Sequence, residues 1–315
     1  LAVGCKGVGI DGTCGYGFHG AIISISFFSR EANVADAARL PELLEQDAGS
    51  GIKAIYDEIK ACCRVPMVAL IYRHLATHDG VLEWSWRVLA PAMRSGALSA
   101  AARQASAAPL TIALPPLLPS EAEALGLTEI DIAAISYVAT AYNTANPHNI
   151  IAVRVLMGLL GADQAQGGAG GDAGAPAVPA AFPVLPPVVQ LEDMPPALAE
   201  RVKRLRVRSD DGSRGIVPTL YRHLAHWPDY MSASAEALAP RFQSGEIETA
   251  AAEIGAAANA AAARLGTELA QFDTPEGRPS GAAREQLLAT FAAFADTIPE
   301  MITVGRLLKE ALPRA

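Results

Sequence analysis

Residues 72–76 of this 315-residue chain read Tyr-Arg-His-Leu-Ala, and residues 221–225 read the same five amino acids. The two copies stand 149 residues apart, and the same offset aligns Leu-Ala-Pro at residues 89–91 with Leu-Ala-Pro at residues 238–240. Chance does not sustain one register over such a distance. A single repeat of this length indicates two equivalent halves rather than a solenoid, which stacks several shorter units.

The apolar periodicity of each copy is that of helices. After position 51, apolar residues recur at spacings of three and four with charged residues between them, as in Ile52, Ile55 and Ile59. No alternating pattern is long enough for a strand, except over residues 21–27. The sequence therefore predicts an all-α fold of two tandem pseudo-symmetric helical repeats, joined by a linker rich in glycine, alanine and proline.

Two helix starts are visible as capping patterns. Ser120 precedes Glu123 by three residues, and Thr128 precedes Asp131 by the same spacing. In such pairs the hydroxyl accepts a hydrogen bond from a free backbone N–H, while the acid lies near the positive end of the helix dipole. We expect a helix to begin at each of these two positions.

A helix break is expected in the middle of the chain. Residues 130–142 and 150–160 are apolar helical segments, and Asn146 followed by Pro147 favours a turn between them. In the second copy, an offset of 152 residues pairs Pro299 with Pro147 and Ile298 with Asn146. Since the second copy does without an asparagine, Asn146 is a candidate for a role in a pocket as well as in a break.

Composition sets the predicted boundaries. We expect an irregular, Gly-rich N-terminal extension over residues 1–48, a first helical repeat over 49–161, a linker over 162–189 and a second repeat over 190–315. The linker has few large apolar side chains and too much proline for a helix.

Charge and cysteine content exclude several classes of partner. The formal net charge of −8 argues against a nucleic-acid partner, which needs a basic face. The four cysteines form no C-x-x-C pair, so we expect reduced thiols, a cytoplasmic location and no metal. The apolar segment at residues 21–28 is far shorter than the roughly 20 residues of a membrane span, and it lacks the flanks of a signal peptide. No membrane association is therefore expected.

A glycine pattern at residues 7–12 matches G-x-G-x-x-G. That pattern binds dinucleotides only between a strand and a helix, and neither flank here qualifies. We therefore expect no nucleotide, and no other cofactor.

Several motifs resemble those of a known family. Arg-Val-Pro at residues 64–66, followed by Leu-Ala-Thr at 75–77 and Trp-Arg at 86–87, is similar to the opening repeat of the group I 2-haloacid dehalogenases, which accept D- and L-enantiomers. Ala-Tyr-Asn-x-x-Asn-Pro at residues 141–147 looks like their buried asparagine segment. The similarity runs from about residue 56 to the C-terminus.

The resemblance implies a cofactor-free hydrolase with its active site between two helical repeats. In this family an aspartate activates a water molecule that attacks Cα of a 2-haloalkanoate directly, and the halide leaves without an ester intermediate. The water-positioning asparagine falls on Asn146, whose amide can both donate and accept. We expect further residues to bind the small carboxylate substrate, namely Met67, Leu70, Asn143, Thr219 and Leu220. Met67 and Leu70 lie at helical spacing and belong first to the core, from which they can also line an apolar pocket.

The general base does not carry over. Counting back from Trp227 and Pro228, the family's catalytic aspartate falls on Leu220, and a leucine cannot activate water. A shifted alignment would leave Asp210 or Asp211 as substitutes. The leading hypothesis is a hydrolytic dehalogenase with an unassigned base. The alternative is a non-catalytic member that binds a small carboxylate in the pocket between the repeats.

The repeated motif offers two further candidates. Arg73 and Arg222 could bind a substrate carboxylate through their donor forks, but their repetition favours a structural role in tying helices together. His74 and His223 have no partners at metal-ligand spacing. A third hypothesis is a purely structural helical pseudo-dimer that self-associates as a homodimer.

Overall fold

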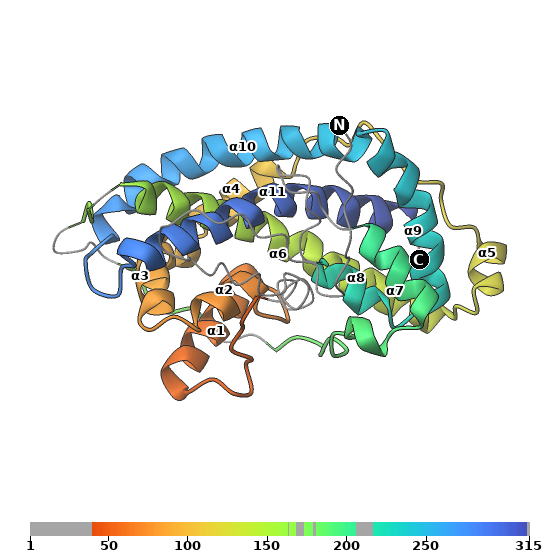
Figure 1. Cartoon of the computed structure of the whole chain (residues 1–315), viewed down its shortest axis with the longest axis horizontal. Helices are drawn as coiled ribbons and strands as arrows, with labels where there is room; N and C mark the ends of the chain where they lie inside the picture. Colours follow the sequence, from red (N-terminus) through yellow and green to blue (C-terminus); the bar gives the residue numbers. More distant parts are fainter. Residues whose placement is uncertain (1–39, 163, 168–172, 179–180, 206–216, 314–315) are drawn as a thin grey trace, which may run out of the picture. The chain divides into compact units, whose positions relative to one another are not determined.

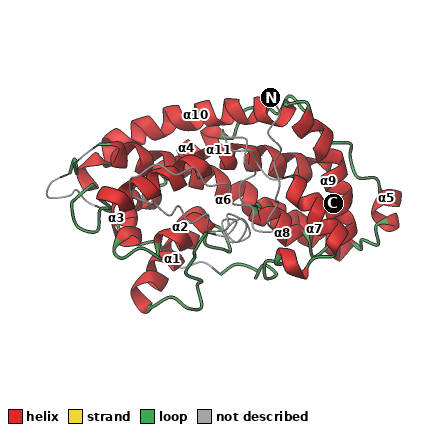
Figure 2. Cartoon of the chain, in the orientation of Figure 1, coloured by secondary structure: helices red, strands yellow, loops and turns green. Residues whose placement is uncertain are grey.

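The computed structural model describes residues 40–162, 164–167, 173–178, 181–205 and 217–313. Throughout these residues the secondary structure is helical, with loops and turns but no strand (Figure 2). The predicted all-α class is therefore confirmed. The glycine pattern at residues 7–12, the apolar segment at 21–28 and most of the predicted extension lie outside the described residues.

Helices follow one another along the whole described chain. They are α1 (Ser50–Cys63), α2 (Leu70–Leu75), α3 (Val81–Arg94), α4 (Ala97–Ala105), α5 (Pro119–Ala124), α6 (Glu129–Gly161), α7 (Pro196–Arg204), α8 (Thr219–Leu224), α9 (Pro228–Gln243), α10 (Glu246–Leu269) and α11 (Gly281–Ala311), with short 3-10 helices at Leu191–Asp193 and Ala270–Phe272.

Helix boundaries reproduce the sequence offsets. The starts of α2 and α8 are 149 residues apart, as are the starts of α4 and α10. The starts of α6 and α11 are 152 residues apart. In these three pairs the two copies begin the same helix at the same place, whereas the starts of α3 and α9 are 147 residues apart. The internal symmetry of the two halves in space stays a prediction.

The two long helices form the centre of the fold. α6 and α11 pack along each other more extensively than any other described pair, and α10 packs against both (Figure 1). Their close approach needs a small residue, because a Cβ atom at Gly305 of α11 would lie 2.3 Å from Oδ1 of Asn143 on α6.

The expected break at Pro147 is wrong. α6 runs unbroken through Pro147, and α11 runs through Pro299 in the same way. A proline inside a helix frees the carbonyl four residues earlier. In α11 that carbonyl belongs to Ala295, and Nη2 of Arg154 donates to it at 3.3 Å. The packing of both helices in the core offsets the rest of the local cost.

Of the two expected helix starts, one is confirmed. Asp131 donates its backbone N–H to the Thr128 side chain, which caps α6 as predicted. The other is wrong, because α5 begins at Pro119 and Glu121 accepts from the Leu118 N–H. Proline is favoured at the first helical position, so the cap lies at Leu118, two residues before Ser120.

Two apolar cores hold the helices together. One contains Trp84 and Phe291, and the other contains Ile135 and Leu308, so each core draws on both sequence copies. Both copies therefore bury their apolar faces against each other.

The described part of the linker contains no helix and is bonded to the helices. Ala177 N donates to Glu58 Oε1 at 3.0 Å, and Gly167 N donates to Asp273 O at 2.8 Å. In the described residues, α11 is the one helix long and apolar enough to cross a membrane. Half of its most apolar stretch, 50%, is buried inside the protein.

Candidate functional site

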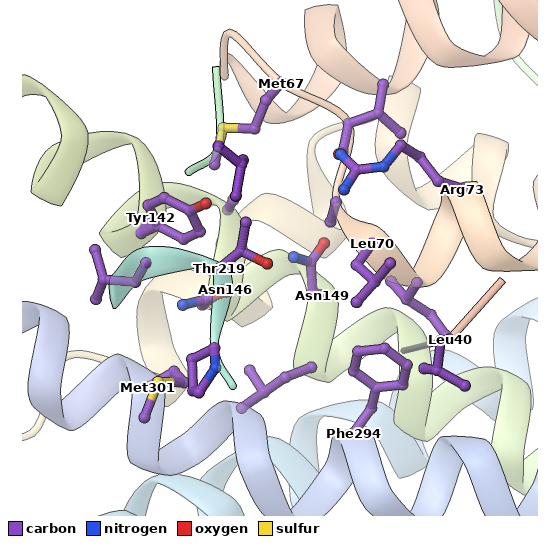
Figure 3. A pocket seen from close by; sticks show the side chains of 18 of the residues that line it. Leu40, Met67, Leu70, Arg73, Tyr142, Asn146, Asn149, Thr219, Phe294 and Met301 are labelled. Atoms are coloured by element: carbon purple, nitrogen blue, oxygen red, sulfur yellow. The ribbon is translucent and has the colours of Figure 1, made fainter. Parts of the chain in front are cut away.

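A cavity of about 1010 Å³ lies between α6 and α11 and is bordered by the starts of α2 and α8 (Figure 3). Its walls include five of the six residues expected at the site, namely Met67, Leu70, Asn146, Thr219 and Leu220. Residues from both sequence copies are therefore brought together at one place.

One wall of the cavity is polar. Tyr142, Asn146 and Asn149 of α6 all line it, and their spacings of four and three residues put them on one helix face. α6 stays helical through Pro147, so the three side chains stay on one face of the helix. We call these three residues the polar wall.

The facing wall is apolar. Phe294, Ile298 and Met301 of α11 line the cavity, and each stands 152 residues after its counterpart in the polar wall. Figure 3 shows Phe294 and Met301 below Tyr142 and Asn149 in the same pocket. We call these three residues the apolar wall. Corresponding positions of the two copies thus carry polar side chains in one and apolar side chains in the other.

The starts of α2 and α8 repeat this difference. Leu70 is the first residue of α2 and Thr219 is the first of α8, and both line the cavity. They are also related by the offset of 149 residues. The hydroxyl of Thr219 joins the polar side of the cavity, while Leu70 adds an apolar surface.

Asn143, also expected to bind substrate, does not line the cavity. Its Nδ2 donates to Gly305 O at 3.0 Å, which ties α6 to α11. The side chain is three residues before Asn146 and one after Tyr142, so it points to the neighbouring helix. We assign Asn143 to helix packing.

A chain of hydrogen bonds crosses the polar side of the cavity. Oη of Tyr142 lies 2.7 Å from Nδ1 of His223, and the Thr219 side chain hydrogen-bonds to the same Tyr142 hydroxyl. Tyr142 and His223 are 8% and 4% exposed, and both line the cavity. Sequence reasoning missed this pair, since 81 residues separate its members.

Both members of this pair are neutral at neutral pH. Burial raises the pKa of the Tyr142 hydroxyl well above its usual range, although Arg73 and Arg222 oppose the rise. Burial also lowers the pKa of the His223 imidazole to about 4, with a smaller contribution from the same two arginines. The two guanidinium groups therefore place a positive potential at the polar side of the cavity.

The arginines themselves have structural partners. Arg73 Nε pairs with Glu42 Oε2 at 2.7 Å, and Arg222 Nε donates to Val189 O at 3.1 Å. Each arginine thus fastens its copy of the repeated motif to a preceding extended segment. These contacts support the structural role that the repetition of Arg73 and Arg222 favours.

Leu220 is buried at 1% exposure. Because its side chain is aliphatic, it supplies no carboxylate where the resemblance places the catalytic aspartate. Glu45 and Asp296 are the carboxylates among the described lining residues. Glu45 is engaged, since Lys60 Nζ lies 2.6 Å from its Oε2. The alternative bases Asp210 and Asp211 lie outside the described residues. Over the described part of the chain, no group of three His, Cys, Asp or Glu side chains could hold a metal ion.

Comparison with known proteins links this fold to dehalogenases. No family model matches the sequence. The chain is 30% identical over 124 residues to a configuration-inverting 2-haloacid dehalogenase of Alcaligenes xylosoxydans xylosoxydans. That match covers 39% of this chain and 42% of the relative, so it spans less than half of either protein.

Solved structures match over most of the chain. A D-2-haloacid dehalogenase mutant in complex with D-2-CPA superposes with a TM-score of 0.68 at 19% identity, covering 87% of this chain and 96% of the other. The complex of D-2-haloacid dehalogenase with L-LA gives 0.68 at 20% identity, with the same coverage. The described helices therefore have the D-2-haloacid dehalogenase fold. The names of these neighbours do not support the D,L-accepting subtype expected from the sequence.

Proposed function

We propose that this chain is a hydrolytic 2-haloacid dehalogenase acting on a small 2-haloalkanoate in the cavity between α6 and α11. The observation that carries the proposal is the position of Asn146, on the polar wall and opposite the apolar wall. Similarity to 2-haloacid dehalogenases in sequence and fold supports the same reaction.

The two walls orient the substrate. Its carboxylate binds at the polar side, where Asn149 and Thr219 supply hydrogen bonds and the two arginines attract an anion. Its alkyl group and halogen lie against the apolar wall, since burying apolar surface there is favourable and burying the carboxylate there is not.

The reaction is then a single displacement. A water molecule held by the Asn146 amide attacks Cα, the carbon–halogen bond breaks, and the halide leaves with the bonding electron pair. Attack from the side opposite to the halogen inverts the configuration, and loss of one proton from the attacking water gives a 2-hydroxyalkanoate. Water is both the nucleophile and the source of the new hydroxyl group, so the step needs no cofactor.

A second candidate function is binding without catalysis. It is favoured by Leu220, which is buried where the resemblance places the catalytic aspartate. In that case the cavity holds a small carboxylate and releases it unchanged. This candidate and the dehalogenase make opposite predictions for halide release.

Halide release from D- and L-2-chloropropionate tests the proposal and determines which enantiomer is accepted. We expect release by the wild-type protein, and a loss of about 100-fold or more in an Asn146→Ala variant. Asn259→Ala, which removes an exposed asparagine from α10, is the matched control and should keep full activity. If neither enantiomer releases halide while calorimetry shows binding, the binding function replaces the dehalogenase.

A further inference from the structure

We infer that Tyr142 and His223 together accept the proton of the attacking water, in place of the aspartate that Leu220 replaces. This inference rests on the proposed function, since it assigns the group that activates water in the same cavity. It identifies Tyr142 as a catalytic residue, and His223 as a positioning residue that acts through Tyr142.

Geometry is the first argument. Tyr142 lies one helical turn before Asn146 on the same face of α6, so a water molecule held by Asn146 lies beside the tyrosine hydroxyl. That hydroxyl is 2.7 Å from Nδ1 of His223, and the two rings meet edge to face with centroids 5.6 Å apart. In Figure 3 the hydroxyls of Tyr142 and Thr219 lie on the same side of the pocket as Asn146.

The proton transfer balances. Water gives one proton to Oη of Tyr142, and Tyr142 gives its own proton to Nδ1 of His223. The remaining hydroxide forms the new bond to Cα while the halide leaves with the electron pair of the broken bond. The imidazole becomes an imidazolium, which returns its proton to solvent after the product has left.

The basicity of His223 suits this role. With a pKa near 4, its imidazole is as strong a base as an ordinary aspartate, whose pKa is about 3.9. The substrate adds a negative charge to a cavity that already carries the potential of Arg73 and Arg222. That charge, followed by the departing halide, stabilises the imidazolium when it forms.

The carboxylates of the cavity are less suitable. Glu45 accepts from Lys60 Nζ and from Val68 N, so its oxygens are held away from the polar wall. Asp296 stands two residues from both Phe294 and Ile298, which turns it about 200° around α11 from the apolar wall and puts it at the rim.

The other copy of the motif supplies the contrast. His74 corresponds to His223, and both histidines bond to the backbone of a preceding proline, Pro41 and Pro186 respectively. The Nδ1 atom of His74 is taken up by that bond and the residue does not line the cavity, whereas Nδ1 of His223 faces the Tyr142 hydroxyl. Phe294 corresponds to Tyr142 and has no hydroxyl. The hydroxyl–imidazole pair therefore belongs to one copy, the copy that carries Asn146.

Four variants test the inference in one halide-release assay, after thermal melts have shown that each is folded. Tyr142→Phe places in α6 the side chain that α11 already has, and His223→Gln removes the acceptor. His74→Gln is the matched control within the repeated motif, and Asp296→Asn tests the rim carboxylate. We expect Tyr142→Phe and His223→Gln to lower kcat about 100-fold with KM changed less than threefold, while the other two stay near wild type.

A pH profile separates proton transfer from a purely structural role. Wild-type kcat should fall on the acid side as His223 becomes protonated, and this limb should be absent from the residual activity of His223→Gln. Wild-type kcat in Tyr142→Phe and His223→Gln would overturn the inference and leave the dehalogenase intact. Loss of activity in Asp296→Asn alone would overturn it in favour of that carboxylate. Absence of halide release by the wild-type protein would remove the proposed function, and the inference with it.

Discussion

Asn146 of α6 and Ile298 of α11 line the same cavity, and they stand 152 residues apart, the distance that also separates the starts of their helices. Two positions that the sequence repeat pairs thus carry an amide on one wall and an aliphatic side chain on the other. A symmetric cavity would bind a symmetric ligand. This asymmetric cavity fits a small molecule with one charged end and one apolar end.

The first prediction exchanges one wall residue for its counterpart. Asn146→Ile should fold normally, because Ile298 shows that the fold accepts isoleucine beside a helical proline. Halide release should fall about 100-fold, since isoleucine cannot hold water. Steady-state kinetics and a thermal melt check both statements. A large drop in Tm would instead assign Asn146 a structural role.

The second prediction concerns the apolar wall. Unbranched alkanoates from acetate to hexanoate should inhibit with affinity rising about fourfold per carbon, as about 0.8 kcal/mol per buried methylene implies. Phe294→Ala should flatten this trend by removing the surface that the chain contacts. Inhibition constants for the series measure it, with Phe242→Ala as a control, because Phe242 belongs to a helix outside the cavity. Equal slopes in both variants would place the alkyl chain elsewhere.

Much of this fold could be predicted because its signals are local. The helical periodicity after position 51 and the Thr128 cap depend on neighbours a few residues apart. Each of these two signals correctly predicted a helix. The Pro147 break failed because a proline's local cost was outweighed by burial of α6, which depends on distant residues such as those of α11. Local preference decided helix starts and ends, but tertiary packing decided helix continuity.

The cavity was predictable only in part, for a similar reason. Asn146 could be found because the repeat exposes it as a difference from Ile298. Tyr142 and His223 lie in different copies, so their contact exists only once α6 has packed beside α8. The duplicated histidine did carry a signal, since one copy of a repeated residue can acquire a function while the other, His74, keeps the structural role.

The third prediction tests the assignment of Asn143 to packing. In Gly305→Ala, the new Cβ would meet Asn143 Oδ1 at 2.3 Å, so the free energy of unfolding should fall by about 1–3 kcal/mol. The same change in an Asn143→Ala background should cost less, because the obstructing oxygen is gone. Urea unfolding of the four proteins measures the coupling. Gly158→Ala on α6 is the control, since no atom lies within 4 Å of its new Cβ, and it should stabilise slightly.

The fourth prediction concerns Glu300 and Glu248, an acidic pair in the second copy that corresponds to His148 and Ser99 in the first. Burial, with smaller contributions from the charges of Glu248 and Asp296, raises the pKa of Glu300 on α11 from 4.5 to about 7. The Oε2 atom of Glu300 is buried without a hydrogen-bond partner in the described structure. The charge of Glu300 also contributes to the raised pKa of the buried Tyr221 hydroxyl. The corresponding pair in the first copy is neutral, with His148 Nε2 at 3.0 Å from Ser99 Oγ.

Because the pKa of Glu300 is raised in the folded state, the folded protein holds this proton more tightly than the unfolded chain does. The stabilising contribution is therefore complete below about pH 4.5 and is lost as the pH rises through about 7. Glu300→Gln should raise Tm by roughly 2 °C at pH 8, where the wild-type carboxylate is charged, and should change it little at pH 5. Melting curves at the two pH values test this, with the exposed Glu285→Gln on the same helix as control. A gain in Tm of the same size at both pH values would show that the substitution acts through packing rather than through the charge of Glu300.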